Sequence, residues 1–130
     1  MNILLIKTDQ PTAELYLYQD KDKVCEKIWQ ADRKLAESIH LEIASLLNKS
    51  GKSLSDLNAI AVYNGPGSFT GLRIGHSVAN ALSYSLKLPI IATSSENWIK
   101  DAITKLLAGD DEKIALPHYG SPVRITKPRK

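Results

Sequence analysis

The sequence is poor in cysteine and in long hydrophobic runs. Its 130 residues include one cysteine, Cys25. A single cysteine excludes an intramolecular disulfide framework and favours a reducing compartment. No apolar run approaches the roughly 20 residues of a membrane span, and the start, Met-Asn-Ile-Leu-Leu-Ile-Lys, lacks the basic segment of a signal peptide. We therefore expect a cytoplasmic chain that folds as one domain.

Acidic residues are missing from the C-terminal end. The net charge is +3, yet residues 113–130 carry five bases and no acid, so that residues 1–112 hold 12 of the 17 bases and all 14 acids. A short basic tail often contacts phosphate, although a solvated, disordered end explains the same composition. The bases at the very end are Arg124, Lys127, Arg129 and Lys130.

Residues suited to catalysis or metal binding are also scarce. His40, His76 and His118 are too far apart in sequence to indicate a metal site. Cys25 falls in the middle of a predicted strand, where a packed thiol is the usual case. Ser68 lacks the Gly-x-Ser-x-Gly frame of a nucleophile elbow. We predict no catalytic residue, no metal and no cofactor.

The hydrophobic periodicity predicts an alternation of strands and helices. Alternating residues predict three short strands joined by tight turns, followed by helix, strand, helix, strand and helix. The predicted strands are 2–7, 13–18, 23–30, 59–63 and 88–92. The predicted helices are Lys34–Lys49, with Asp32 as its cap, Gly71–Leu86 and Glu96–Leu107. This order predicts an α/β domain of ribonuclease H or actin-like ATPase type over residues 1–108, a half-domain with a mixed five-stranded sheet. An extended basic tail follows over 109–130, and we expect it to lie on the body near its start and to be free at its end.

A glycine-rich stretch, Asn64 to Gly75, stands at the centre of this pattern. It follows an apolar run and opens the second helix, which predicts a strand, a tight turn and a helix with Ser68 or Thr70 as N-cap. A turn of this kind can also present N–H groups to an anion, so a structural turn and a phosphate cradle both remain open. The residues that would form either the structural turn or the phosphate cradle are Gly65, Gly67, Ser68, Thr70 and Gly71. The stretch matches neither a Walker A loop nor a dinucleotide fingerprint.

The second helix carries more apolar surface than one sheet face usually covers. Its predicted polar arc is narrow and contains Arg73, His76, Ser77, Asn80, Ser83 and Tyr84. Its apolar arc spans close to half the circumference, which indicates burial on more than one side. The second cover is either a partner protein or the remainder of the domain's own core.

The run Gly65-Pro-Gly-Ser-Phe-Thr-Gly-Leu-Arg-Ile-Gly75, together with the first eight residues, resembles the TsaB (YeaZ) family. That bacterial family takes part in making N6-threonylcarbamoyladenosine (t6A) at position 37 of tRNAs that read ANN codons. The resemblance covers about residues 1–108, and Pro117 to Lys130 is similar to the family's C-terminal end. Family members usually continue into a second half-domain, so we expect a short form. Lys7 stands where the catalytic actin-like relatives carry an aspartate, and a lysine cannot ligate a cation.

The resemblance implies a non-catalytic scaffold subunit. It would bind a TsaD-like catalytic subunit, joined by a TsaE-like ATPase, and act on tRNA indirectly. For the chain alone, a homodimer and a monomer both remain open. The family pairs two helices of each subunit into a bundle, and the matching helices here are Lys34–Lys49 and Gly71–Leu86. The expected interface residues are Leu41, Ala44, Ile74, Val78 and Ala81, and the expected tRNA contacts are Arg124, Lys127, Arg129 and Lys130. The alternative is a small actin-like ATPase or a peptidase that uses the glycine-rich loop.

Overall fold

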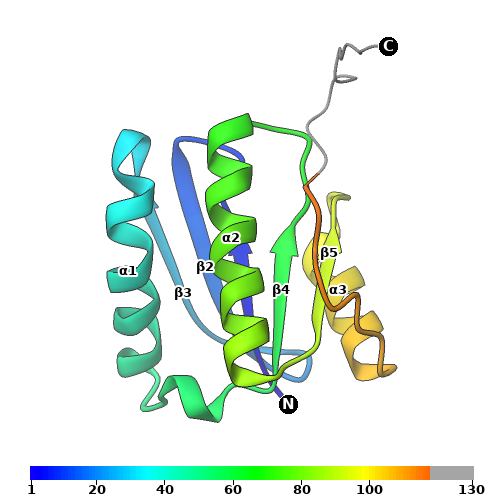
Figure 1. Cartoon of the computed structure of the whole chain (residues 1–130). Coiled ribbons are helices and arrows are strands. Elements are labelled where there is room, and N and C mark those ends of the chain that lie inside the picture. Colours follow the sequence, from blue (N-terminus) through cyan, green and yellow to red (C-terminus); the bar gives the residue numbers. More distant parts are fainter. Residues whose placement is uncertain (118–130) are drawn as a thin grey trace, which may run out of the picture.

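A computed structural model describes residues 1–117 (Figure 1). It contains five strands and three helices, as predicted, with ends that differ from the prediction by a few residues. The strands are β1 (Asn2–Lys7), β2 (Thr12–Gln19), β3 (Asp22–Gln30), β4 (Ala59–Tyr63) and β5 (Ile90–Thr93). The helices are α1 (Leu35–Lys49), α2 (Phe69–Leu86) and α3 (Trp98–Leu107). The expected tRNA contacts Arg124, Lys127, Arg129 and Lys130 lie outside the described residues.

The strands form one mixed sheet with the order β3-β2-β1-β4-β5. β1 is antiparallel to β2, with Leu4 opposite Leu17, and β2 is antiparallel to β3. β1 and β4 are parallel, as are β4 and β5. Tight turns suffice for the antiparallel pairs, whereas each parallel pair needs a helical crossover, which α1 and α2 provide. The predicted mixed five-stranded sheet is confirmed.

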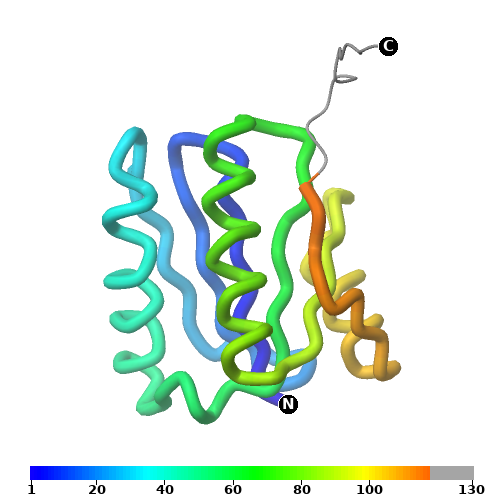
Figure 2. Tube along the Cα trace, viewed as in Figure 1, coloured from blue at the N-terminus to red at the C-terminus, as the bar shows by residue number. Residues whose placement is uncertain are grey.

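Helices cover both faces of the sheet (Figures 1 and 2). Leu4 and Ile6 of β1 belong to the core cluster beneath α1 and α2. Ile3 and Leu5 belong to the cluster beneath α3. Because its side chains alternate between two buried faces, β1 is a nearly continuous apolar run, as expected for a central strand.

The buried stripe of α1 is the one that its periodicity predicts. It consists of Leu35, Ile39, Ile43, Leu46 and Leu47. The prediction that Asp32 caps this helix is wrong. Asp32 has a φ of 49° and opens a short 3-10 turn, Asp32–Lys34, that precedes α1. Its carboxylate accepts a hydrogen bond from Gln30 Nε2 at 2.9 Å, so it acts on the end of β3 rather than on α1.

Residues 110–117, here called the strap, return from α3 along β5 and α2, beside which they run in orange in Figures 1 and 2. Glu112 N donates to the carbonyl of Ile90 at 2.9 Å. Ala115 is buried and exchanges two hydrogen bonds with the Asn80 side chain, at 2.8 and 2.9 Å. The start of the predicted tail therefore lies on the body of the domain, as expected.

Candidate functional site

The glycine-rich turn connects β4 to α2 and packs against the segment that follows β1. Ser68 is the N-cap of α2, since its Oγ accepts a hydrogen bond from Gly71 N at 3.3 Å. Ser68 N in turn donates to the carbonyl of Asp9 at 3.0 Å. Thr8 Oγ1 donates to the carbonyl of Gly71 at 2.7 Å. These bonds join the start of α2 to residues 8 and 9.

The close contact between the turn and residues 8 and 9 explains why glycines recur at this spacing. Gly67, Gly71 and Gly75 are four residues apart, which places them on one side of the turn and helix. A Cβ on Gly67 would overlap Asp9, and a Cβ on Gly71 or Gly75 would overlap Thr8. Glycine allows this close approach because it has no side chain. The arrangement favours the structural interpretation of the turn over the phosphate cradle, because residues 8 and 9 occupy the space beside it.

Lys7 ends β1 next to this turn and is held by the chain's own acids. Its Nζ lies 2.6 Å from Asp9 Oδ1 and 3.9 Å from Glu14 Oε2. The same amino group lies 4.6 Å from the ring centroid of Tyr63. A cationic group here opposes the binding of a metal ion. Across residues 1–117, the structure contains no group of three or more His, Cys, Asp or Glu that could hold one.

The predicted polar arc of α2 is wrong at His76 and Ser83, because both side chains are buried. His76 Nδ1 lies 2.8 Å from the Leu72 carbonyl oxygen, and its Nε2 lies 3.0 Å from Asn64 Oδ1. Both partners are acceptors in this orientation, so a neutral ring satisfies only one of them; turning the Asn64 amide by 180°, so that its N–H faces Nε2, lets a neutral ring satisfy both. Burial lowers the pKa of His76, and the Leu72 carbonyl partly opposes that shift. Ser83 Oγ donates to the Leu88 carbonyl at 2.6 Å.

The structure places the five expected interface residues on the neighbouring helices α1 and α2, at unequal depths and not in one hollow, because Leu41 and Ala44 line a separate hollow beside residues 52–54. Leu41 of α1 is 72% exposed, and Ala44 and Ala81 are also exposed. Ile74 is half-buried, whereas Val78 is only 8% exposed and belongs to the core. Ile74 and Val78 therefore help to form a groove of about 400 Å³ between the helices, whose other lining residues are Ala36, His40, Thr70, Arg73 and Ser77.

Arg73, which lines this groove, is exposed and charged. Five other exposed residues of the two helices are uncharged, and we call them the outer strip: Leu41 and Ala44 on α1, and Ser77, Ala81 and Ser85 on α2. Four of the five are alanine or serine, which lets another helix approach closely. The cores of protein interfaces are depleted of charged residues. The composition of the outer strip is thus typical of a surface that another protein covers.

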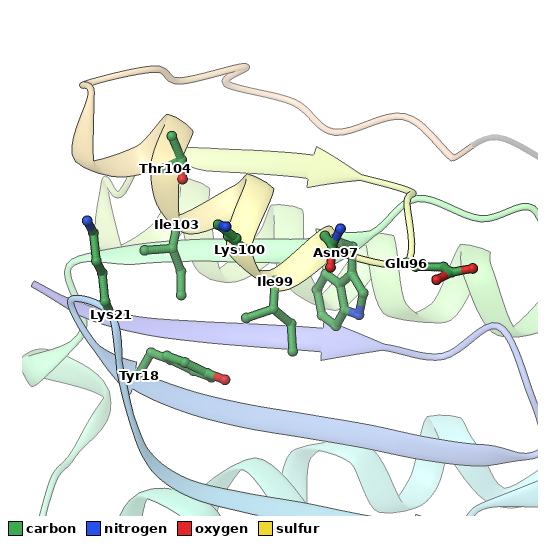
Figure 3. A pocket seen from close by; sticks show the side chains of 9 residues that line it. Tyr18, Lys21, Glu96, Asn97, Ile99, Lys100, Ile103 and Thr104 are labelled. Carbon is green, nitrogen blue, oxygen red and sulfur yellow. The ribbon is translucent and has the colours of Figure 1, made fainter.

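A second cavity, of about 470 Å³, lies on the opposite face of the sheet, between α3 and the turn that joins β2 to β3 (Figure 3). Tyr18, Ile99 and Ile103 give it an apolar wall, and Lys21 and Lys100 stand at its side. It contains no residue of the glycine-rich turn or the outer strip. Sequence reasoning did not find it, because its lining comes from a turn and a helix that carry no shared motif.

None of the helices described within residues 1–117 is long and apolar enough to cross a membrane. Comparison with known proteins gives a family match over residues 29–105, to the model described as TsaD, tRNA N6-adenosine threonylcarbamoyltransferase. The chain is 34% identical over 120 residues to the tRNA threonylcarbamoyladenosine biosynthesis protein TsaB of Escherichia coli, covering 88% of this chain and 52% of that protein. It is 31% identical over 103 residues to the tRNA N6-adenosine threonylcarbamoyltransferase of Bacillus subtilis, covering 70% and 30%.

Among solved structures, YeaZ from Pseudomonas aeruginosa is similar with a TM-score of 0.67 and 29% identity. That match covers 72% of this chain and 43% of YeaZ. The likeness to TsaB and YeaZ confirms the resemblance predicted from the glycine-rich run, and with the family match it confirms the predicted actin-like fold. The chain spans about half the length of the TsaB relative it matches.

Proposed function

The chain belongs to the protein family described as TsaD, tRNA N6-adenosine threonylcarbamoyltransferase, and from this premise we propose that it acts in t6A biosynthesis as a TsaB-like, non-catalytic subunit. It binds a TsaD-like catalytic subunit through the outer faces of α1 and α2. A TsaE-like ATPase joins this pair, and tRNA is the substrate of the assembly. In the absence of the catalytic subunit, two copies of the chain pair through the same faces.

The observation that carries this proposal is the outer strip. Leu41 is a large apolar side chain that is 72% exposed, and its neighbours in the outer strip are small and uncharged. Leaving such a surface in water forgoes about 25 cal/mol for each Å² of apolar area that a partner would bury. A pair of helices from a related subunit fits this surface, because helices with small residues pack ridge into groove at short distances.

The non-catalytic part of the proposal is supported by the end of β1. The ammonium group of Lys7 is neutralised by Asp9, and residues 8 and 9 fill the space beside the glycine-rich turn. An ATPase or a peptidase that uses this loop would need that space for its substrate. ATP hydrolysis with Mg²⁺, measured for the chain alone and with its partner lacking its own active site, is expected to equal the buffer rate. A partner-independent turnover would contradict this part of the proposal.

Co-purification with the TsaD-like protein of the same organism tests the partner. The wild-type chain is expected to form a stable heterodimer, and Leu41→Glu and Ala81→Glu are each expected to abolish it, because each places a charge at the centre of the interface. Leu107→Glu is the matched control, since Leu107 is an exposed leucine on α3, over the opposite face of the sheet. A heterodimer that survives both outer-strip variants would show that these helix faces are not the contact.

We also propose that the basic end of the chain contacts tRNA in the assembled complex. The support is compositional: residues 113–130 hold five bases and no acid. Removal of residues 124–130 is expected to weaken tRNA binding by the complex, more strongly at low salt than at high salt, because each lost phosphate contact reduces counterion release. Equal affinities at low salt with and without these residues would refute the contact.

A further inference from the structure

Three large apolar side chains are exposed close to the outer strip. Tyr84 of α2 is 88% exposed, and Ile114 and Leu116 of the strap are 65% and 73% exposed. The strap runs beside α2 (Figures 1 and 2), so that α1, α2 and the strap lie next to one another on the same side of the sheet. Single exposed apolar residues are common on protein surfaces, whereas neighbouring ones mark an interaction site.

The strap presents these side chains from a fixed position. Asp111 Oδ1 accepts hydrogen bonds from Ile90 N at 3.1 Å and from Lys113 N at 2.8 Å. Farther along, Ala115 exchanges two hydrogen bonds with Asn80 and points into the core, so its neighbours on either side point outward. Because the backbone is already ordered, a partner that binds here loses little conformational entropy of the strap.

Tyr84 connects the strap to the outer strip. It follows Ala81 by three residues and Ser77 by seven, which places the three on one side of α2. On its other side, Tyr84 and Lys113 line the same hollow, of about 560 Å³, between the end of α2 and the strap. Tyr84 therefore adjoins the outer strip on one side and the strap on the other, with Lys87, Asp111 and Lys113 lining the same hollow.

We propose that Tyr84, Ile114 and Leu116, here called the strap patch, extend the outer strip into a single surface that binds the TsaD-like subunit. This inference rests on the function proposed above and enlarges the site through which it operates. The occupant is an apolar surface of that subunit, because the strap patch continues the uncharged outer strip and contains no charged residue. A tyrosine flanked by aliphatic side chains is also a frequent centre of binding energy in protein interfaces.

The affinity for the purified TsaD-like subunit, measured by calorimetry or surface plasmon resonance, tests the strap patch. Tyr84→Ala, Ile114→Ser and Leu116→Ser are each expected to weaken binding by about 5- to 30-fold, and the triple variant by more than 100-fold. The melting temperature is expected to stay unchanged, because all three side chains lie outside the core. Leu107→Ser and Val24→Ser, which change exposed apolar residues over the other face of the sheet, are matched controls and should keep wild-type affinity.

The outcomes separate this inference from the proposed function. If the wild-type chain does not bind the subunit, or if Leu41→Glu and Ala81→Glu both still bind, the proposed function fails. If Leu41→Glu abolishes binding but the strap-patch triple variant keeps wild-type affinity, only the present inference is overturned. A chain that ends at residue 117 should bind as the full chain does. Loss of binding by the shortened chain would show that residues 118–130 carry the contact in place of the strap patch, and would overturn the inference.

Discussion

Small residues have opposite roles in two regions: the start of α2 with the turn before it, and the outer side of the same helix. At its start, Gly67, Gly71 and Gly75 let the turn and helix lie directly on Thr8 and Asp9. Farther along, Ser77, Ala81 and Ser85 leave the other side of the same helix flat and exposed. The first region is closed by the chain itself, and the second is closed by no part of residues 1–117. Small side chains therefore indicate close packing, and only the fold shows whether the neighbour is internal or external.

The largest loss of stability is expected from a substitution at Gly71, which disrupts the closed side of α2. Gly71→Ala is expected to lower the free energy of unfolding by about 3 kcal/mol, because the new Cβ would overlap the backbone carbonyl of Thr8, which cannot move away as a side chain would. Gly51→Asn is the control. Gly51 has a φ of 72° with nothing near its Cβ position, and asparagine adopts this conformation readily. Urea unfolding measures both, and equal stability of the two variants would contradict the close contact.

The ion pair beside the glycine-rich turn should give the next largest effect. Lys7→Met is expected to cost about 2 kcal/mol, because it leaves the buried Asp9 carboxylate without its cation. The double variant Lys7→Met with Asp9→Asn should recover part of that loss, since no uncompensated charge then remains. A double-mutant cycle in urea measures the coupling. Additive losses would show that the two groups act independently of each other.

His76 adds a dependence on pH to the closed side of α2. Its pKa is lowered in the folded chain, so the folded state favours the neutral ring, whereas the unfolded ring takes up a proton below about pH 6.5. The stability that this difference provides is complete above that pH and is lost as the pH falls below it. Unfolding in urea from pH 7.5 to 5 should show the loss, and His76→Gln should reduce it.

The smallest change in the free energy of unfolding is expected at the exposed outer strip. Leu41→Gln should change the free energy of unfolding by less than about 0.5 kcal/mol, because most of this side chain is in water in the isolated chain. The same variant should still weaken binding to the TsaD-like subunit. If Leu41→Gln instead destabilises the isolated chain by as much as Lys7→Met does, the outer strip belongs to the domain's own packing and the comparison fails.

Periodicity was sufficient to predict most of the fold. The stripe of α1 from Leu35 to Leu47 is buried as predicted, and Ser68 caps α2. These features depend on residues close in sequence, whose spacing determines which face of a helix is apolar. The predicted turn after β4 follows from the same local signals, since glycine and a capping hydroxyl are needed whatever the turn packs against.

Some features depend on hydrogen bonds between side chains and backbone atoms, which a helical projection of the side chains does not show. His76 and Ser83 look polar in a helical projection, yet both are buried because the carbonyls of Leu72 and Leu88 satisfy them. The fixed position of the strap depends on hydrogen bonds between Asn80 and the backbone of Ala115, which no side-chain pattern reports. Val78 was expected at the interface, and its burial arises from how α1 and α2 sit on the sheet.

The strap also affects how the two outer strands of the sheet, β5 and β3, are protected from pairing with other molecules. Along β5, Glu112 N and the Asp111 carboxylate already occupy the carbonyl and the N–H of Ile90. On the opposite edge, β3 carries the charged side chains Lys23, Glu26 and Lys27, which discourage the addition of a strand from another molecule. The strap thus covers one edge and charged side chains line the other, and both features oppose the stacking of sheets edge to edge into fibres.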